Sequence, residues 1–183
     1  MTRTQKILLA FTGLFLFAGF AKAGTDTNAP VPVGGGPADI DLRSQPNLPR
    51  GMRNNNPGNL RRTSINWQGK VPHSESTDSA FEQFYKFKWG IRAMLKDLQN
   101  DYRVDGKRTL TALINAYAPP IENDTFLYIQ DVAAWTGINP QFQFPDTKAY
   151  WKPIVIAMAR KENGRADAIT PAQFEQVWGE FNF

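Results

Sequence analysis

The stretch WGIRAMLKDLQNDY, residues 89–102, decides the class of the fold. Five large apolar side chains recur along it at intervals of three and four residues: Ile91, Met94, Leu95, Leu98 and Tyr102. This spacing places them on one face of an α-helix, where they can pack against a core. We expect the helix to end near Asp105 and Gly106, because glycine often terminates a helix.

Four further helices are expected downstream, each preceded by a residue that can cap its first turn. The capping positions are Thr109, Asp124 or Thr125, Asp146 or Thr147, and Thr170. The predicted ends include Pro119-Pro120, Gly137 and Gly164. The last helix begins with the sequence TPAQ, residues 170–173, which is a capping-box pattern with proline at the first helical position.

Two short segments ahead of these helices alternate in polarity, namely residues 65–69 and 81–85. Such alternation is typical of extended chain, so we expect two short strands or a small hairpin. Combined with five helices joined by short loops, this pattern predicts a mainly α (α+β) fold with a small extended region.

The chain has 183 residues, which is one domain's worth of sequence once a leader is removed. Residues 1–23 resemble a signal peptide, with a basic start, an apolar run and Ala-Lys-Ala before the expected cleavage site. The alternative is an uncleaved anchor, although the run is shorter than the roughly 20 residues of a transmembrane helix. Residues 24–49, rich in Pro and Gly, are predicted to be a flexible tether. The folded domain is expected over residues 50–183.

The formal net charge of +4 belongs mostly to the predicted leader. Without Arg3, Lys6 and Lys22, 18 basic residues face 17 acidic ones, a net charge of +1. We therefore expect no nucleic-acid partner. Five arginines nevertheless crowd residues 43–62, a region without any acidic residue. This cluster either meets an anionic polymer such as a cell-wall glycan peptide or forms a solvated surface.

The sequence RNNNPGNL, residues 53–60, is expected to be a loop. Asparagine side chains compete for local backbone hydrogen bonds, and proline and glycine interrupt regular structure. Composition alone leaves open whether this loop is a solvent-exposed turn or the wall of a site.

Several chemistries can be set aside. The chain has no cysteine, which excludes disulfides, a lipidated N-terminal cysteine and a cysteine nucleophile. Its single histidine, His73, lies in a polar loop, so a metal site or a Ser/His/Asp triad would depend on that one residue. No glycine-rich phosphate-binding motif is present. We expect neither a metal nor a cofactor, which leaves carboxylates and amides.

Glu162 is the first candidate for catalysis because it lies in the last turn of a predicted helix. The negative end of the helix dipole disfavours a charged carboxylate and should raise its pKa. A raised pKa is what a general acid needs in order to protonate a glycosidic oxygen near neutral pH. The alternative is a solvated carboxylate neutralised by Arg160, Lys161 or Arg165.

Two other glutamates are candidates. Glu122 follows the double proline just ahead of a helix start, so it either holds a substrate hydroxyl or helps to cap that helix. Glu82 lies between Phe81 and Phe84, and points either into a cleft or into water. Asp78, in a polar turn, ranks lower.

The motifs of this chain, taken in order, resemble a family of small phage and prophage proteins. They are RGMRNNNPGNLRR, WQG, FEQF, WGIRAMLKDL, YAPPIENDTFLYIQDVAAWTG and IAMARKENG, and they span residues 50–164. Members of that family carry the Arg-Asn-Asn-Asn-Pro-Gly-Asn signature and are often described as virion or structural proteins. They look like lysozyme-like murein hydrolases or lytic transglycosylases.

The resemblance implies a lysozyme-like domain with a cleft between a small extended lobe and a helical lobe. In relatives that look most like transglycosylases, a helix ending in a catalytic glutamate precedes the Asn-rich loop. Here only residues 24–49 lie between the predicted leader and that loop region. We infer a circularly permuted arrangement, in which the helix that ends near Glu162 returns beside the loop and supplies the acid.

The resemblance also implies an exported enzyme that cleaves the peptidoglycan glycan strand, with Glu162 protonating the leaving oxygen. A lytic transglycosylase needs no second carboxylate, whereas a muramidase would use Glu82 or Glu122 to activate water. The implied substrate-binding residues are Arg53, Asn55, Asn56 and Asn59, with Trp67 or Tyr117 as sugar platforms.

Two further interpretations stay open. One is a non-catalytic virion or envelope protein that binds murein, and the other is cleavage of murein peptide bonds. The expected partner is the peptidoglycan glycan strand, with a membrane contact only through an uncleaved N-terminal segment. The expected location is periplasmic or extracellular, with virion association or membrane anchoring as alternatives.

Overall fold

The structure is a computed structural model that describes residues 38–121, 123–181 and 183. Within these residues the fold consists of six α-helices: α1 (Arg50–Arg53), α2 (Phe87–Arg103), α3 (Leu110–Tyr117), α4 (Thr125–Thr136), α5 (Lys148–Asn163) and α6 (Pro171–Glu180). The predicted mainly α fold is confirmed. The predicted leader, the first part of the tether and Glu122 lie outside the described residues. Among the helices described, none combines the length and the apolar character needed to cross a membrane.

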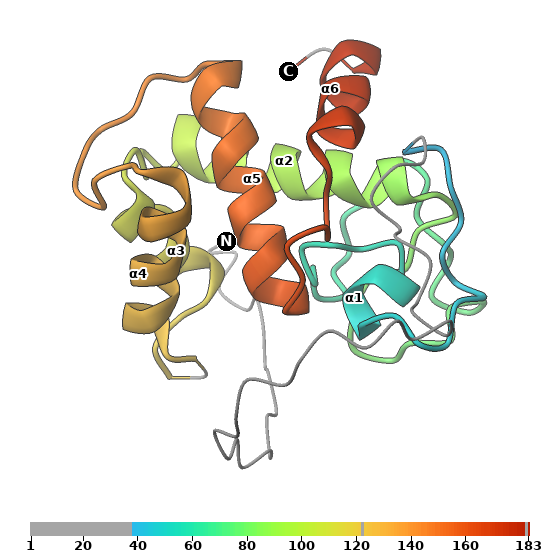
Figure 1. Ribbon diagram of the computed structural model, residues 1–183. Helices are drawn as coiled ribbons and strands as arrows, with labels where there is room; N and C mark the ends of the chain where they lie inside the picture. The colour runs from blue at the N-terminus through green and yellow to red at the C-terminus, as the bar shows by residue number, and fades with distance from the viewer. Residues whose placement is uncertain (1–37, 122, 182) are drawn as a thin grey trace, which may run out of the picture.

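Helix α5 is the centre of the arrangement, because it contacts α1, α2, α4 and α6. Figure 1 shows α3 and α4 on one side of α5, and α1 with its neighbouring loops on the other. Trp151 of α5 is fully buried, and its ring lies edge-on to those of Tyr102 and Phe144, with centroids 5.5 and 5.4 Å apart. The C-terminal end of α5 lies beside the loop that follows α1.

The predicted caps account for the starts of α3, α4 and α6, whereas Thr147 at the start of α5 makes no side-chain cap hydrogen bond. The side chains of Thr109 and Asp124 accept hydrogen bonds from the first turns of α3 and α4. Thr170 forms the predicted capping box with Gln173 at the start of α6. Gly137 and Gly164 close α4 and α5 in the left-handed conformation that glycine adopts without steric cost.

The predicted extended region consists of isolated bridges rather than strands. Phe81 pairs with Arg61, and Phe84 pairs with Lys70, both in antiparallel fashion. Residues 81–85 thus pair with one segment at their start and with another at their end: Glu82 donates to the carbonyl of Leu60, and Tyr85 donates to that of Gly69. Because the partner changes after so few residues, no ladder of hydrogen bonds can extend.

The packed chain begins earlier than the predicted boundary at residue 50. Ala38, Leu42 and Leu48 are buried in the core, although they lie in the segment predicted to be a flexible tether. The carbonyls of Ala38 and Ile40 accept hydrogen bonds of 2.8 Å from the start of α2. Residues 38–49 are therefore packed against the domain, which corrects the tether prediction for these residues.

Candidate active site

The Asn-rich loop, residues 53–60, is held in a conformation that depends on its residue types. Asn55 and Asn59 have positive φ angles of 52° and 47°, in the left-handed region that asparagine tolerates better than most residues. The loop packs directly onto α2, where a Cβ atom added at Gly90 would overlap the backbone carbonyl of Asn55. The backbones can come this close only because Gly90 has no side chain.

Replacing Gly90 with alanine should therefore lower the free energy of unfolding by about 2 kcal/mol or more, because the loop backbone cannot move away cheaply. Gly179, a helical glycine in α6, has open space around its would-be Cβ atom. Gly179→Ala should leave stability unchanged or slightly raised, since alanine is the better helix former. Urea denaturation of both variants measures the difference. Equal stability of the two would contradict the close packing of the loop on α2.

Asn55 and Asn56 stabilise the loop from inside and do not face a ligand. Both side chains are 0% exposed. Asn55 donates to Asp41 and to the carbonyl of Phe84, and accepts from the backbone of Leu42, at 2.8 to 2.9 Å. The Asn56 amide likewise donates twice and accepts once within the fold. This corrects the prediction that these two amides contact substrate, because their hydrogen-bonding groups are already used.

Asn59 is the asparagine that reaches a candidate catalytic group. Its side-chain nitrogen donates to a carboxylate oxygen of Glu162 at 3.0 Å and to the Glu162 backbone carbonyl at 3.1 Å. The Tyr128 hydroxyl of α4 donates to the other carboxylate oxygen at 2.9 Å. Asn163 binds the carbonyl of Pro57 at 2.8 Å. The end of α5 thus lies against the Asn-rich loop, as we inferred from the sequence.

Burial is the main reason why the pKa of Glu162 is raised, from an ordinary value of 4.5 to about 7. The side chain is only 7% exposed, so its charged form loses the stabilisation of water. Hydrogen bonds from Asn59 and Tyr128 and the charge of Lys161 lower the pKa in turn, without cancelling the effect of burial. The direction agrees with the sequence-based expectation, but desolvation causes the shift where we expected the helix dipole to do so.

This shift predicts a specific dependence of stability on pH. Because the pKa is higher in the folded than in the unfolded chain, Glu162 contributes stability that is complete below about pH 4.5 and is lost as the pH rises through about 7. The difference in unfolding free energy between the wild type and Glu162→Gln should change by about 3 kcal/mol across this window. Urea denaturation from pH 4 to 8 measures it. Parallel curves for the two proteins would show that Glu162 is not perturbed.

The predicted sugar platforms differ in accessibility. Tyr117 is fully buried, and its hydroxyl donates to the carbonyl of Gly58, so its ring cannot stack on a sugar. This corrects that prediction and assigns Tyr117 a role in holding the Asn-rich loop. Trp67 is partly buried against the core. Its predicted contact with substrate stays a prediction, as does the role of Glu122.

Glu82 belongs to a separate polar cluster. Its carboxylate accepts a hydrogen bond of 2.8 Å from the backbone of Thr63 and lies 2.9 Å from the His73 ring and 3.6 Å from the Lys70 ammonium group. The Glu82 side chain is buried, which excludes the orientation into water, one of the two that the sequence left open. His73, the single histidine of the chain, pairs with this carboxylate. The sequence could not reveal this pair, because the two residues come together only when the turn between them folds.

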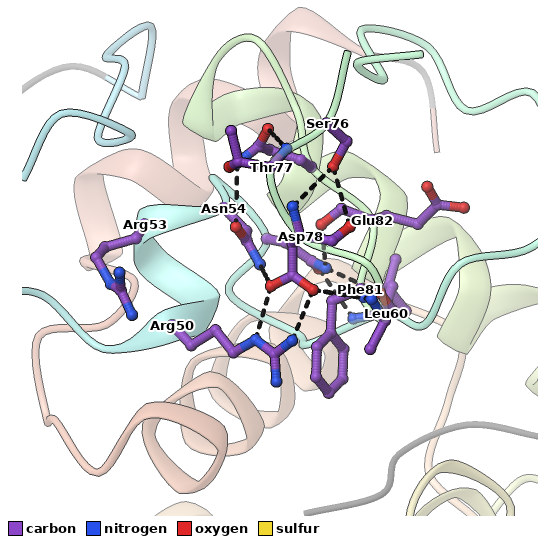
Figure 2. Close-up of polar contacts among 12 residues, drawn as sticks. Arg50, Arg53, Asn54, Leu60, Ser76, Thr77, Asp78, Phe81 and Glu82 are labelled. Carbon is purple, nitrogen blue, oxygen red and sulfur yellow. Dashed lines mark hydrogen bonds and ion pairs between the residues drawn. The ribbon is translucent and has the colours of Figure 1, made fainter. Parts of the chain in front are cut away.

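A polar pocket lies beside α1, at the start of the Asn-rich loop. Its volume is about 270 Å³, and it is lined by Arg50, Arg53, Asn54, Thr77, Asp78 and Ser79. Figure 2 shows Arg50 and Asn54 pointing at the Asp78 carboxylate. Burial opposes ionisation of Asp78, but hydrogen bonds from Arg50, Asn54 and two backbone N–H groups hold its pKa well below the usual range. Asp78, ranked low from sequence, is the centre of this network.

Tyr128 was missed in the sequence because it belongs to the apolar face of α4. A buried tyrosine hydroxyl needs a hydrogen-bond partner, and that requirement is the signal that could have pointed to it. Among the described residues, no cluster of acidic and histidine side chains is arranged to hold a metal ion. The candidate active site is therefore the carboxyl group of Glu162 with its two donors, Asn59 and Tyr128.

Comparison with known proteins identifies a phage relative. No known family model matches the chain. Protein P5 of Pseudoalteromonas phage PM2 is 37% identical to it over 118 residues, which cover 63% of this chain and 71% of P5. Similarity at this level over most of P5 shows common descent, so the chain belongs to the family of phage PM2 protein P5.

Proposed function

We propose that this protein is an exported, phage-associated enzyme that cleaves the glycan strand of peptidoglycan, with Glu162 as the general acid. The observation that carries the proposal is the carboxyl group of Glu162, whose pKa is raised to about 7 by burial. Such a group is substantially protonated near neutral pH, so it can give its proton to a substrate and become a carboxylate. The phage relative supports a role for the chain in a phage life cycle.

The hydrogen bonds around Glu162 fit this role. Each carboxyl oxygen accepts one hydrogen bond, from Asn59 or from Tyr128, so each keeps a lone pair that can carry the acid proton. The two donors fix the orientation of the carboxyl group before substrate arrives, and they stabilise the carboxylate that forms when the proton leaves. A glycosidic oxygen would receive this proton as its bond to the sugar breaks.

The environment of Glu82 favours a lytic transglycosylase over a muramidase. A muramidase needs a second carboxylate to activate water or to attack the sugar. Glu82, the described candidate, is buried and already engaged by Thr63, His73 and Lys70. In a transglycosylase the substrate's own hydroxyl attacks instead and gives its proton to the Glu162 carboxylate formed in the first proton transfer, and the product is an anhydro sugar. A single acid at Glu162 suffices for that reaction.

Turnover of murein sacculi tests the proposal. The purified protein should release soluble muropeptides that end in an anhydro sugar, as identified by mass spectrometry. Reducing ends in the products would indicate a muramidase. Cleavage of cross-links with intact glycan strands would instead support the interpretation that the protein cleaves murein peptide bonds.

A second candidate function is a non-catalytic virion or envelope component that binds murein. Two observations favour it: the relative is a phage protein, and the Glu162 side chain is only 7% exposed. Sedimentation of the protein with sacculi, without release of any product, would select this function over the enzyme.

A further inference from the structure

The pocket beside α1 has a binding chemistry that the proposed acid at Glu162 does not use. It is lined by side chains from two segments, α1 with the first residue after it and the turn at residues 77–79. All of its lining side chains are polar or charged. Its volume is about 270 Å³. This is room for one small charged group, such as a single amino-acid unit.

The one carboxylate in the pocket is already neutralised. Asp78 accepts hydrogen bonds from two nitrogens of Arg50, at 2.6 and 2.7 Å, and from the side chain of Asn54 at 2.6 Å. The backbone N–H groups of Ala80 and Phe81 donate to it as well, both at 3.0 Å. Five donors leave no lone pair of Asp78 free for a ligand, and the charge of Arg50 offsets that of the carboxylate.

Arg53 carries the positive charge that remains in the pocket. Its Nε atom donates to the carbonyl of Leu48 at 3.0 Å, which anchors the base of the guanidinium group. Within the described part of the chain, its two terminal nitrogens have no hydrogen-bond or ion-pair partner. Figure 2 shows Arg53 at the edge of the network, apart from the group that surrounds Asp78. The guanidinium group of Arg53 is thus held at Nε, while its two terminal nitrogens can donate to a ligand in the pocket.

Arg50 is a second guanidinium group of the pocket, and its orientation is fixed. Its guanidinium carbon lies 4.5 Å from the centre of the Phe81 ring, so the group is held both by stacking and by Asp78. Its third nitrogen, Nη1, is not used by Asp78, and the side chain is 52% exposed. Ser79 also lines the pocket. The two arginines, both held in place by contacts within the fold, form a set of donors suited to an oxyanion.

We propose that this pocket binds a carboxylate of the peptide stem of murein, beside the glycan strand held at Glu162. The substrate part of this inference rests on the proposed function. A singly charged carboxylate matches the single uncompensated charge of the pocket, whereas a doubly charged phosphate would exceed it. The Asn-rich loop lines the pocket through Asn54 and contacts Glu162 through Asn59, so one rigid loop serves both sites.

Calorimetry tests the inference. It measures the binding of a muramyl dipeptide with one free carboxylate to the full chain. The wild type should bind this acid at least about ten-fold more tightly than the matching uncharged amide. Arg53→Gln should weaken binding of the acid by a similar factor and should no longer distinguish acid from amide. The control Arg103→Gln removes the same charge from the last turn of α2 and should bind like the wild type.

Three outcomes would overturn the inference: equal binding of acid and amide by the wild type, unchanged binding of the acid by Arg53→Gln, or tighter binding of inorganic phosphate than of the acid. The comparison of acid with amide on the wild type does not depend on how well any variant folds. The probe has a single sugar and no glycosidic bond to another sugar. Its binding therefore reports on the pocket whether or not the protein cleaves glycan strands.

Discussion

Replacing Glu162 with glutamine is expected to lower the rate of muropeptide release from murein sacculi by at least about 100-fold, while leaving the fold intact. Glutamine has the same shape as glutamate but has no acidic proton to transfer. Its carbonyl oxygen can accept from Asn59, and its NH₂ group can donate to the Tyr128 hydroxyl after that hydroxyl rotates. The variant should therefore keep the local structure and lose only the acid. The rate is measured by chromatography of the released products.

Glu175→Gln is the matched control for this experiment. Glu175 lies in α6, where its carboxylate pairs with Lys148 and Lys152 at 2.9 and 2.8 Å. The same chemical change there should leave the rate of release within about two-fold of the wild type, because surface ion pairs contribute little. Full activity of Glu162→Gln would remove Glu162 from the mechanism. Equal losses in both variants would show that the assay reports stability rather than acid catalysis.

The helices were predictable because their signals are local. Thr109, Asp124 and Thr170 each cap a helix through a side chain that bonds within the same turn, and a single sequence contains all of that information. Helix α1 was not predicted, because it has only four residues and no side-chain cap at Pro49. Its position depends on contacts with α5, which lies about a hundred residues further along the chain.

The site was only partly predictable for the same reason. Glu162 could be singled out because a glutamate in the last turn of a helix is unusual, and this is a local observation. The different roles of the asparagines depend on contacts far along the chain. Asn59 reaches Glu162, whereas Asn55 and Asn56 bind the backbone of neighbouring segments. Four amides in one loop look equivalent in a sequence. Only the direction of each side chain separates the scaffold from the site.

Replacing Asn55 with alanine is expected to lower the free energy of unfolding by about 4 kcal/mol. The change removes two buried hydrogen bonds, to Leu42 and Phe84, and a partly buried one to Asp41, and each buried group left without a partner costs about 1 to 3 kcal/mol. Alanine also tolerates the positive φ angle of 52° less well than asparagine does. Chemical denaturation measures the loss. Asn115→Ala, at an exposed position of α3, should change stability by less than about 0.5 kcal/mol.

The same variant separates two explanations for the packing of residues 38–49. If the Asn55 amide holds this segment, the Leu42 N–H should lose its protection from hydrogen exchange in Asn55→Ala, because that N–H donates to the missing oxygen. If burial of Ala38, Leu42 and Leu48 is sufficient, protection of the neighbouring N–H groups should persist and the loss of stability should be well below 4 kcal/mol. The first result would make the Asn-rich loop the clamp that joins the N-terminal segment to the domain. The second would limit the role of the loop to positioning Glu162 and lining the pocket beside α1.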